Sequence, residues 1–256
     1  MSIGQPNYIS RFYANQSRLR GITSVEDIEV AEALQSGVYN RLVYKHLEAY
    51  KKRKVVEIAC GPGIFMRYLH KRGFVEVMGI EMSDCYADIC ISQGFKVIKA
   101  DALKWLESQP NSSIDVIVAI DFIEHIDKQT FINFLDAVHS VLSPNGLFIA
   151  RCPCGDSPFF GLNFYNDITH ETVFTSTALR VLISLCNMEI IELVDDYPSN
   201  IIDSRWWRVP LSHISRKFMQ KIIYWSTGQY IKNLSPDMWI VAKPTNIIEN
   251  FNLTNS

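Results

Sequence analysis

The chain has 256 residues, 48% of them hydrophobic and 20% charged, which excludes a disordered polypeptide and predicts one large globular domain with appended segments. Its 25 basic and 27 acidic residues give a formal net charge of −2, which argues against a nucleic-acid-binding surface over the whole chain. The six cysteines form no paired CxxC motifs, and the sequence has neither a signal-peptide pattern nor an apolar run long enough to span a bilayer. We therefore expect a reduced, cytoplasmic protein without a nucleic-acid partner.

Short apolar runs alternate with helical stretches along most of the chain. Ser24 and Asp27 have the spacing of a capping box, which predicts a helix that runs to about His46. Strands are then expected at 55–59, 75–80, 95–98, 114–120, 147–150, 189–194 and 238–242, with helices at 65–71, 86–92, 130–142 and 177–186. This alternation predicts βαβ units and a mostly parallel sheet covered on both faces.

Two segments interrupt the alternation. Residues 152–175 are polar and rich in Gly, Pro, Asn and aromatic residues, and residues 196–235 form an insertion before the last strand. We therefore divide the chain into an N-terminal helical cap (1–50), an α/β core (51–195), a helical insertion (196–235) and a last strand with a tail (236–256).

A glycine loop follows the first expected strand, in the sequence Glu57-Ile58-Ala59-Cys60-Gly61-Pro62-Gly63. Gly61 and Gly63 allow a ligand to approach the backbone closely. A dinucleotide site would need a third glycine where Met66 stands, and a diphosphate would be repelled by Glu57. A carboxylate at this position suits a ligand that carries an ammonium group.

Acidic residues also end the next three strands. Glu81, followed by Met82, is placed to accept both hydroxyls of a ribose. Asp101, followed by Ala102, is placed to accept a hydrogen bond from an adenine amine, and Asp121 lies at the rim of the same crevice. Each acid alone could be a solvated loop carboxylate or a helix cap, but four consecutive strands that end in acids indicate one nucleoside site.

These residues resemble the class I S-adenosylmethionine-dependent methyltransferases, from about Lys54 to Lys243. Segment 56–63 is similar to the first motif of that family, although Ala59 stands where glycine is commonest. The resemblance implies a Rossmann-like sheet of seven strands with the last one antiparallel, and S-adenosyl-L-methionine as the cofactor. It assigns cofactor contacts to Glu57, Cys60, Gly61, Gly63, Glu81, Met82, Asp101, Ala102 and Asp121.

Segment 167–174, Asp-Ile-Thr-His-Glu-Thr-Val-Phe, resembles the region after strand five in methyltransferases that modify bacterial sugars. The resemblance implies O-methylation of a sugar hydroxyl in a surface glycan or its precursor, which could be lipid-linked. Segment 121–124 lacks the Asn/Asp-Pro-Pro-aromatic pattern of base-amine methyltransferases, so a nucleobase acceptor is disfavoured. A methyltransferase of a quinone, lipid or other small acceptor, and a non-catalytic nucleoside-binding module, stay open as alternatives.

Methyl transfer to a hydroxyl needs alignment of the reactants and a group that accepts the proton. We expect His170 to be this base, with His125 as the alternative, and Asp167 to orient the imidazole of His170. An aspartate base, an acceptor bound to a metal ion and catalysis by proximity alone stay open. Asp121, Asp167 and Glu171 offer oxygens to Mg²⁺, but their spacing matches no recognised site, so no metal is expected.

The insertion is basic and aromatic. Residues 201–235 contain six Lys or Arg residues and one acid, Asp203. A helix would place four apolar side chains on one face: Ile214, Phe218, Ile222 and Trp225. We expect this face to form a lid over the crevice, and the same features suit contact between 205–232 and an anionic membrane, at the inner face of the plasma membrane.

Overall fold

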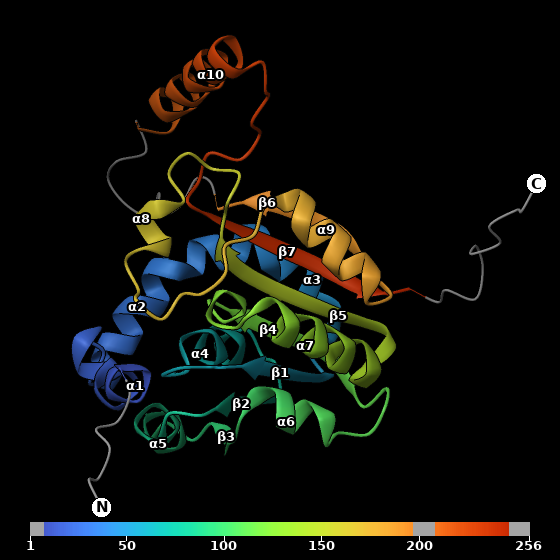
Figure 1. Ribbon diagram of the computed structural model, residues 1–256. Coiled ribbons are helices and arrows are strands. Elements are labelled where there is room, and N and C mark those ends of the chain that lie inside the picture. The colour runs from blue at the N-terminus through green and yellow to red at the C-terminus, as the bar shows by residue number, and fades with distance from the viewer. Residues whose placement is uncertain (1–7, 197–207, 246–256) are drawn as a thin grey trace, which may run out of the picture.

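A seven-stranded sheet forms the centre of the protein, whose computed structural model describes residues 8–196 and 208–245. The strand order is β3-β2-β1-β4-β5-β7-β6 (Figure 1). Strands β1 to β5 pair in parallel, whereas β7 is antiparallel to β5 and β6. The strands are β1 (Lys54–Ile58), β2 (Glu76–Glu81), β3 (Lys96–Lys99), β4 (Ile114–Ile120), β5 (Leu142–Pro153), β6 (Met188–Asp195) and β7 (Asp237–Pro244). The predicted fold class is confirmed.

Helices cover both faces of this sheet, with α2, α3, α4 and α5 on one face and α6, α7 and α9 on the other (Figure 1). They are α1 (Tyr8–Leu19), α2 (Val25–Val38), α3 (Tyr44–Leu47), α4 (Ile64–Lys71), α5 (Asp84–Ser92), α6 (Ala102–Glu107), α7 (Lys128–Val141), α8 (Gly161–Phe164), α9 (Ser176–Leu185) and α10 (Arg208–Thr227). The expected helices after the first strand are found as α4, α5, α7 and α9. Sequence analysis missed α1, α6 and α8, because α1 is largely polar and the other two are very short.

Alternating side chains of the central strands build two separate cores. Val55 and Val116 pack with α2, α3 and α4, whereas Val56 and Ile117 pack with α6, α7 and α9. All four are fully buried, as expected for strands covered on both faces. The two cores fix β1 beside β4, so the carboxyl ends of these parallel strands meet at one edge of the sheet.

The N-terminal helices are joined to this edge. The predicted capping box is confirmed, because Ser24 accepts a hydrogen bond from the backbone N–H of Asp27, whose side chain accepts from the backbone of Ser24. The helix continues through a π-helical segment (Tyr39–Val43) into α3. Tyr39 is buried and makes edge-on ring contacts with Phe65 of α4 and Trp239 of β7, which holds the N-terminal segment against the core.

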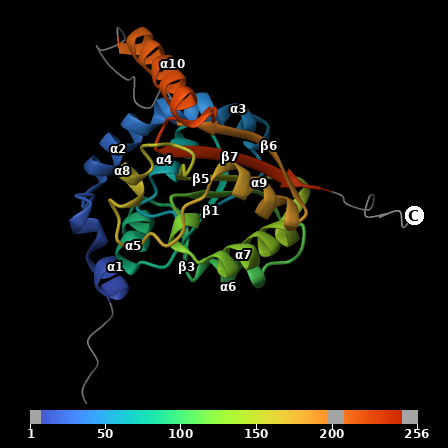
Figure 2. The same ribbon diagram turned by 45° about the horizontal axis from the view of Figure 1, so that its top comes forward.

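Helix α10 projects away from the body of the protein (Figures 1 and 2). The predicted helix and its apolar face are present, but that face is exposed rather than packed over the crevice. The opposite side of the helix is anchored, since Arg216 pairs with Asp195 and Gln220 donates to the carbonyls of Ile231 and Lys232. Residues 197–207, which hold part of the predicted basic and aromatic cluster, and the tail after 245 lie outside the described residues.

Gly79 of β2 allows α4 and the glycine loop to lie close to the sheet. A Cβ atom on Gly79 would lie 2.5 Å from Sγ of Cys60 and 2.8 Å from Sδ of Met66. We therefore expect Gly79→Ala to lower the free energy of unfolding by about 1–3 kcal/mol through overpacking. Urea denaturation measures this, with Val75→Ala on the exposed approach to the same strand as a control expected to stay within about 0.5 kcal/mol of wild type. Equal stability of both variants would contradict the packing argument.

Candidate functional site

A cavity of about 450 Å³ lies at the carboxyl ends of the parallel strands. Its wall contains most of the residues predicted from the sequence: Glu57, Cys60, Gly61, Glu81, Met82, Asp101, Ala102, Asp121 and His125. Gly63, Asp167 and His170 lie outside this wall. The strand ends thus bring together residues separated by up to 68 positions, as the parallel topology requires.

The loop after β1 turns sharply through left-handed backbone conformations. Ala59, Gly61 and Gly63 have φ angles of 50°, 52° and 83°. A side chain on Gly63 would also meet Sγ of Cys90 at 2.9 Å, so this position requires glycine on two grounds. Cys60 is buried with its sulfur turned toward Gly79, so it offers its backbone rather than its side chain to the cavity.

Glu57 is a buried carboxyl group at the floor of the cavity. Its exposed fraction is 4%, and its Oε2 atom has no hydrogen-bond partner in the part of the chain that the structure describes. Burial raises the pKa of this carboxyl well above its usual range, and Cys90 and Glu81 add to the shift. A cationic group that entered the cavity would supply the missing partner.

Glu81 lies at the end of β2 and supports the glycine loop. Its Oε2 accepts from the backbone N–H of Gly61 at 2.8 Å, and its Oε1 accepts from that of Ser83 at 2.7 Å. Burial raises the pKa of Glu81, and backbone hydrogen bonds from Ser83, Gly61 and Met82 partly offset this effect. Each oxygen keeps a second lone pair for a ligand hydroxyl. The neighbouring Met82 exposes its side chain in the cavity wall.

Asp101 and Asp121 have partners within the protein. Asp101 is the N-cap of α6 and accepts from the backbone N–H of Lys104 at 3.0 Å, with Ala102 beginning the helix beside it. Asp121 pairs with Arg151 of β5 through two hydrogen bonds, one of 2.7 Å from Nε to Oδ1. Burial would raise the pKa of Asp121, but the Arg151 guanidinium outweighs it and holds this pKa below its usual range.

Asp167 does not orient His170, contrary to the sequence-based expectation. Its carboxylate accepts from the backbone N–H of Thr169 at 2.9 Å and from the Thr169 hydroxyl at 2.6 Å, and it pairs with Arg20. The carboxylate is satisfied by its own turn and by the N-terminal segment. The hydroxyl of Thr169 lies between this carboxylate and Nδ1 of the other histidine, His125.

His125 forms part of the cavity wall with a defined orientation. Its Nδ1 lies 2.9 Å from Oγ1 of Thr169, whose single hydrogen is donated to Asp167. The hydroxyl therefore accepts from Nδ1–H, which leaves a lone pair on Nε2 of His125. Burial and the nearby His170 lower the pKa of His125 to about 4, so the imidazole is neutral at physiological pH.

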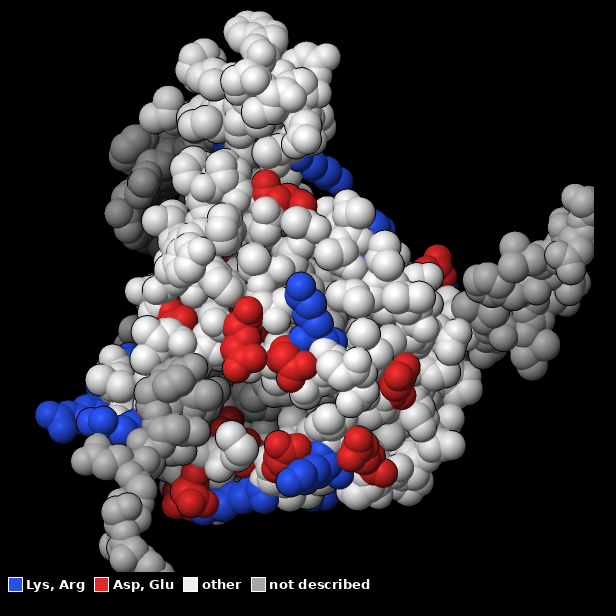
Figure 3. Space-filling model, viewed as in Figure 1, with Lys and Arg blue, Asp and Glu red and all other residues white. Residues whose placement is uncertain are grey.

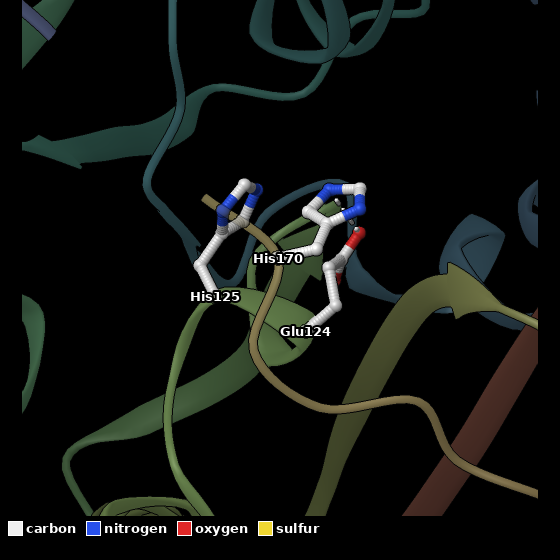
Figure 4. Close-up of side chains that lie close together, drawn as sticks. All are labelled: Glu124, His125 and His170. Atoms are coloured by element: carbon white, nitrogen blue, oxygen red, sulfur yellow. Dashed lines mark ion pairs between the residues drawn. The ribbon is translucent and has the colours of Figure 1, made fainter. Parts of the chain in front are cut away.

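His170 packs behind His125, with 4.5 Å between the ring centroids (Figure 4). Its Nδ1 lies 2.8 Å from the carbonyl oxygen of Phe164, which can only accept, so in the neutral ring the lone pair is on Nε2. That Nε2 lies 3.9 Å from Oε1 of Glu124, too far for a hydrogen bond. Glu124 is 1% exposed and its Oε2 has no partner.

The structure adds residues that sequence analysis missed. Arg20 and Tyr39 line the cavity from the N-terminal helices, and Arg151 lines it from β5. Of these three residues, only Arg151 could have been predicted from the sequence, because it directly follows the apolar run 147–150. No described residue of 208–235 lines the cavity, so the predicted lid is not present in the described part of the insertion.

The three acidic residues that the sequence offered as Mg²⁺ ligands do not form a common site. Asp121 and Asp167 are engaged with Arg151 and Arg20, and the side chain of Glu171 is exposed. Among the described residues, the group whose geometry could hold a metal ion is Glu124, His125 and His170.

The chain is similar to known proteins in its sequence pattern and in its fold. The chain matches the model of a family described as a methyltransferase domain over residues 30–217, whereas the comparison with curated proteins found no relative. A SAM-dependent methyltransferase structure from Archaeoglobus fulgidus is 22% identical with a TM-score of 0.62, over 93% of this chain and all of its own.

Two other solved structures extend the range of chemistry. A 1,6-didemethyltoxoflavin N1-methyltransferase from Burkholderia thailandensis, with bound S-adenosylhomocysteine, is 14% identical with a TM-score of 0.56, over 93% of this chain and 89% of its own. The 4+2 cyclase SpnF is 13% identical with a TM-score of 0.59, over 92% of this chain and 95% of its own. Such distant structures establish the fold alone. The family model matches more than half of the chain, which therefore belongs to the methyltransferase-domain family.

Proposed function

We propose that the protein transfers a methyl group to a hydroxyl of a sugar in a bacterial surface glycan or its precursor. The observation that carries this proposal is the neutral imidazole of His125, which is held in the cavity wall with an uncommitted lone pair on Nε2. A sugar hydroxyl is a weak nucleophile and must lose its proton during methyl transfer. His125 is the group that we expect the acceptor hydroxyl to meet.

The cavity fits the cofactor. S-Adenosylmethionine supplies a methyl group on a positively charged sulfur, together with an ammonium group, a ribose and an adenine. The orphaned carboxyl oxygen of Glu57 suits the ammonium group, and the free lone pairs of Glu81 suit the ribose hydroxyls. Asp101 and the exposed Met82 offer an acceptor and an apolar surface to the adenine. The turn at Gly61 brings the backbone close to the ligand.

The reaction balances without a further reagent. The acceptor loses the proton of its O–H bond and forms an O–C bond, while the S–C bond breaks and S-adenosylhomocysteine leaves as a neutral thioether. The residues of the chain therefore have two tasks, which are to align the hydroxyl and to assist loss of its proton. Thr169 and Asp167 act as positioning residues, because they fix the ring of His125.

Two other functions are distinguished by product analysis. The toxoflavin-related neighbour is named for a small heterocyclic acceptor, which keeps small molecules such as a quinone or lipid as the second candidate. The neighbour named for a cyclisation illustrates that this fold also serves other chemistry, and a non-catalytic binding module predicts cofactor binding without turnover. The fixed imidazole beside the cofactor cavity favours catalysis.

We also propose that α10 contacts an anionic membrane, which would bring the protein to lipid-linked substrates at the inner face of the plasma membrane. Residues 208–236 contain five Lys or Arg residues and no Asp or Glu. The outer face of α10 exposes an apolar stripe: Leu211, Ile214, Phe218, Ile222 and Trp225. Lys217 and Lys221 flank it, and with two tyrosines they line a groove of about 350 Å³. In Figure 3, which has the orientation of Figure 1, α10 lies at the top, and few acidic side chains are visible there.

No described helix is both long and apolar enough to cross a bilayer, so α10 would lie along the membrane surface. Its 20 residues span about 30 Å, enough for several lipid headgroups.

The assignment of Glu81 to the ribose is tested by equilibrium binding of S-adenosylhomocysteine. We expect Glu81→Ala to weaken binding about 10- to 100-fold, since hydrogen bonds to a charged group contribute about 1.5–3 kcal/mol. Glu76→Ala, at the exposed start of the same strand, is the matched control and should bind normally. Undiminished affinity in Glu81→Ala refutes the ribose contact.

The acceptor class is tested with methyl-labelled S-adenosylmethionine and a fractionated bacterial extract containing soluble metabolites, nucleic acid, lipid-linked glycan and polysaccharide. We expect label in a glycan fraction, reduced about 10²- to 10⁴-fold by His125→Ala with cofactor binding retained. His139→Ala on α7 is the control and should transfer normally. Label in quinones or other small lipids would establish the second candidate, and cofactor binding with label nowhere would favour the binding module.

The membrane proposal is tested by sedimentation with vesicles. We expect the protein to bind phosphatidylglycerol vesicles, and Lys217→Gln/Lys221→Gln to weaken binding about 30-fold, at about 1 kcal/mol for each lysine near the surface. Lys52→Gln/Lys96→Gln, which removes two exposed charges elsewhere, should bind as wild type. Equal binding by both double variants, or no preference for anionic over phosphatidylcholine vesicles, would contradict the proposal.

A further inference from the structure

Three side chains beside the cavity bring atoms that can ligate a metal ion close together. Glu124 and His125 come from the turn after β4, and His170 comes from the loop after β5 (Figure 4). The ligand atoms that the three offer lie within 4.8 Å of one another. Each Nδ1–H is already donated to an oxygen, of Thr169 for His125 and of Phe164 for His170. Nε2 of each ring therefore stays available as a ligand atom, and Oε2 of Glu124 has no hydrogen-bond partner among the described residues.

We propose that Glu124, His125 and His170 bind a divalent transition-metal ion, which activates the acceptor hydroxyl. The proposal rests on the proposed function for the role of the ion, but not for its binding. Two imidazoles and one carboxylate suit Mn²⁺, Fe²⁺, Co²⁺ or Zn²⁺ better than Ca²⁺, which prefers oxygen ligands. Three protein ligands also leave coordination positions open for a substrate oxygen.

The surroundings of these ligands are those of a metal site. Each imidazole is oriented through its other nitrogen by an oxygen of the protein, which is the usual outer support of a histidine ligand. Glu124 is almost fully buried with Oε2 unpartnered, a costly arrangement unless a proton or a cation completes it. Metal–ligand distances of about 2.0–2.2 Å need shifts of only about 1 Å in these side chains.

The position of His125 would bring a bound ion close to the acceptor hydroxyl. His125 lines the cavity, so an ion held by it would be reached by a substrate from the cofactor side. A cation lowers the pKa of a bound hydroxyl, which then loses its proton to solvent at neutral pH. Nε2 of His125, which faces the acceptor in the proposed function, would hold the ion beside the acceptor hydroxyl.

Metal binding is measured on the chelator-treated full-length protein by titration with Mn²⁺, with electron paramagnetic resonance reporting the free ion. We expect one Mn²⁺ per chain and a rise in melting temperature. Glu124→Gln, which keeps the shape of the side chain, should weaken binding at least about tenfold. Glu171→Gln is the matched control, because its carboxyl is exposed and only its backbone contacts Glu124.

Circular dichroism verifies that the variants are folded, and His170→Gln repeats the test should Glu124→Gln not fold. Wild type that takes up no Mn²⁺, or ligand variants that bind as tightly as Glu171→Gln, would overturn the inference. Full methyl transfer by the metal-free protein in excess chelator would overturn the role of the ion while leaving the proposed function intact. Mn²⁺ binding that depends on Glu124, without methyl transfer to any fraction, would support the site and remove the proposed function.

Discussion

The ion pair between Asp121 and Arg151 organises the polar edge of the sheet. Asp121 follows β4 with a φ angle of 53°, and Arg151 comes from β5, so the pair joins two strand ends. The guanidinium also lies 5.5 Å from the ring of Trp239 in β7, which contacts Tyr39 of the N-terminal segment. One partly buried cation thereby links β4, β5, β7 and the N-terminal segment. Because such a pair is costly to break, the charge of Arg151 fixes the position of the whole edge.

A second polar connection joins distant segments to the reacting side of the cavity. Arg20 pairs with Asp167, Asp167 accepts from Thr169, and Thr169 holds the ring of His125. The N-terminal helices and the loop after β5 therefore orient a side chain that neither segment contains. Burial would raise the pKa of Asp167, but its hydrogen bonds to Thr169, together with the nearby charges, hold that pKa below its usual range.

The sequence predicted those features that depend on local pattern. The strands, the glycine loop and the acids at the strand ends follow from periodicity and from the rule that parallel strands present their carboxyl ends together. The partner of Asp167 could not be found in this way, since Arg20 lies 147 positions away. For the same reason sequence spacing paired Asp167 with His170, three residues on, whereas the fold connects it to His125. The apolar face of α10 was also read correctly as a pattern, but a pattern does not say whether a face packs against the chain or against something outside it.

Glu57 illustrates how the cavity can select its ligand by charge. With one oxygen unpartnered and a pKa well above the usual range, this carboxyl is most stable with its proton when the cavity holds no cation. An ammonium group would lower that pKa again, so binding of a zwitterionic or cationic ligand exchanges a proton for a charge pair. A ligand of similar shape without the ammonium group would leave the carboxyl neutral, and its free energy of binding would be less favourable. The burial that makes Glu57 unfavourable in isolation would thus favour a cationic ligand, because the ion pair would offset the cost of burying the carboxylate.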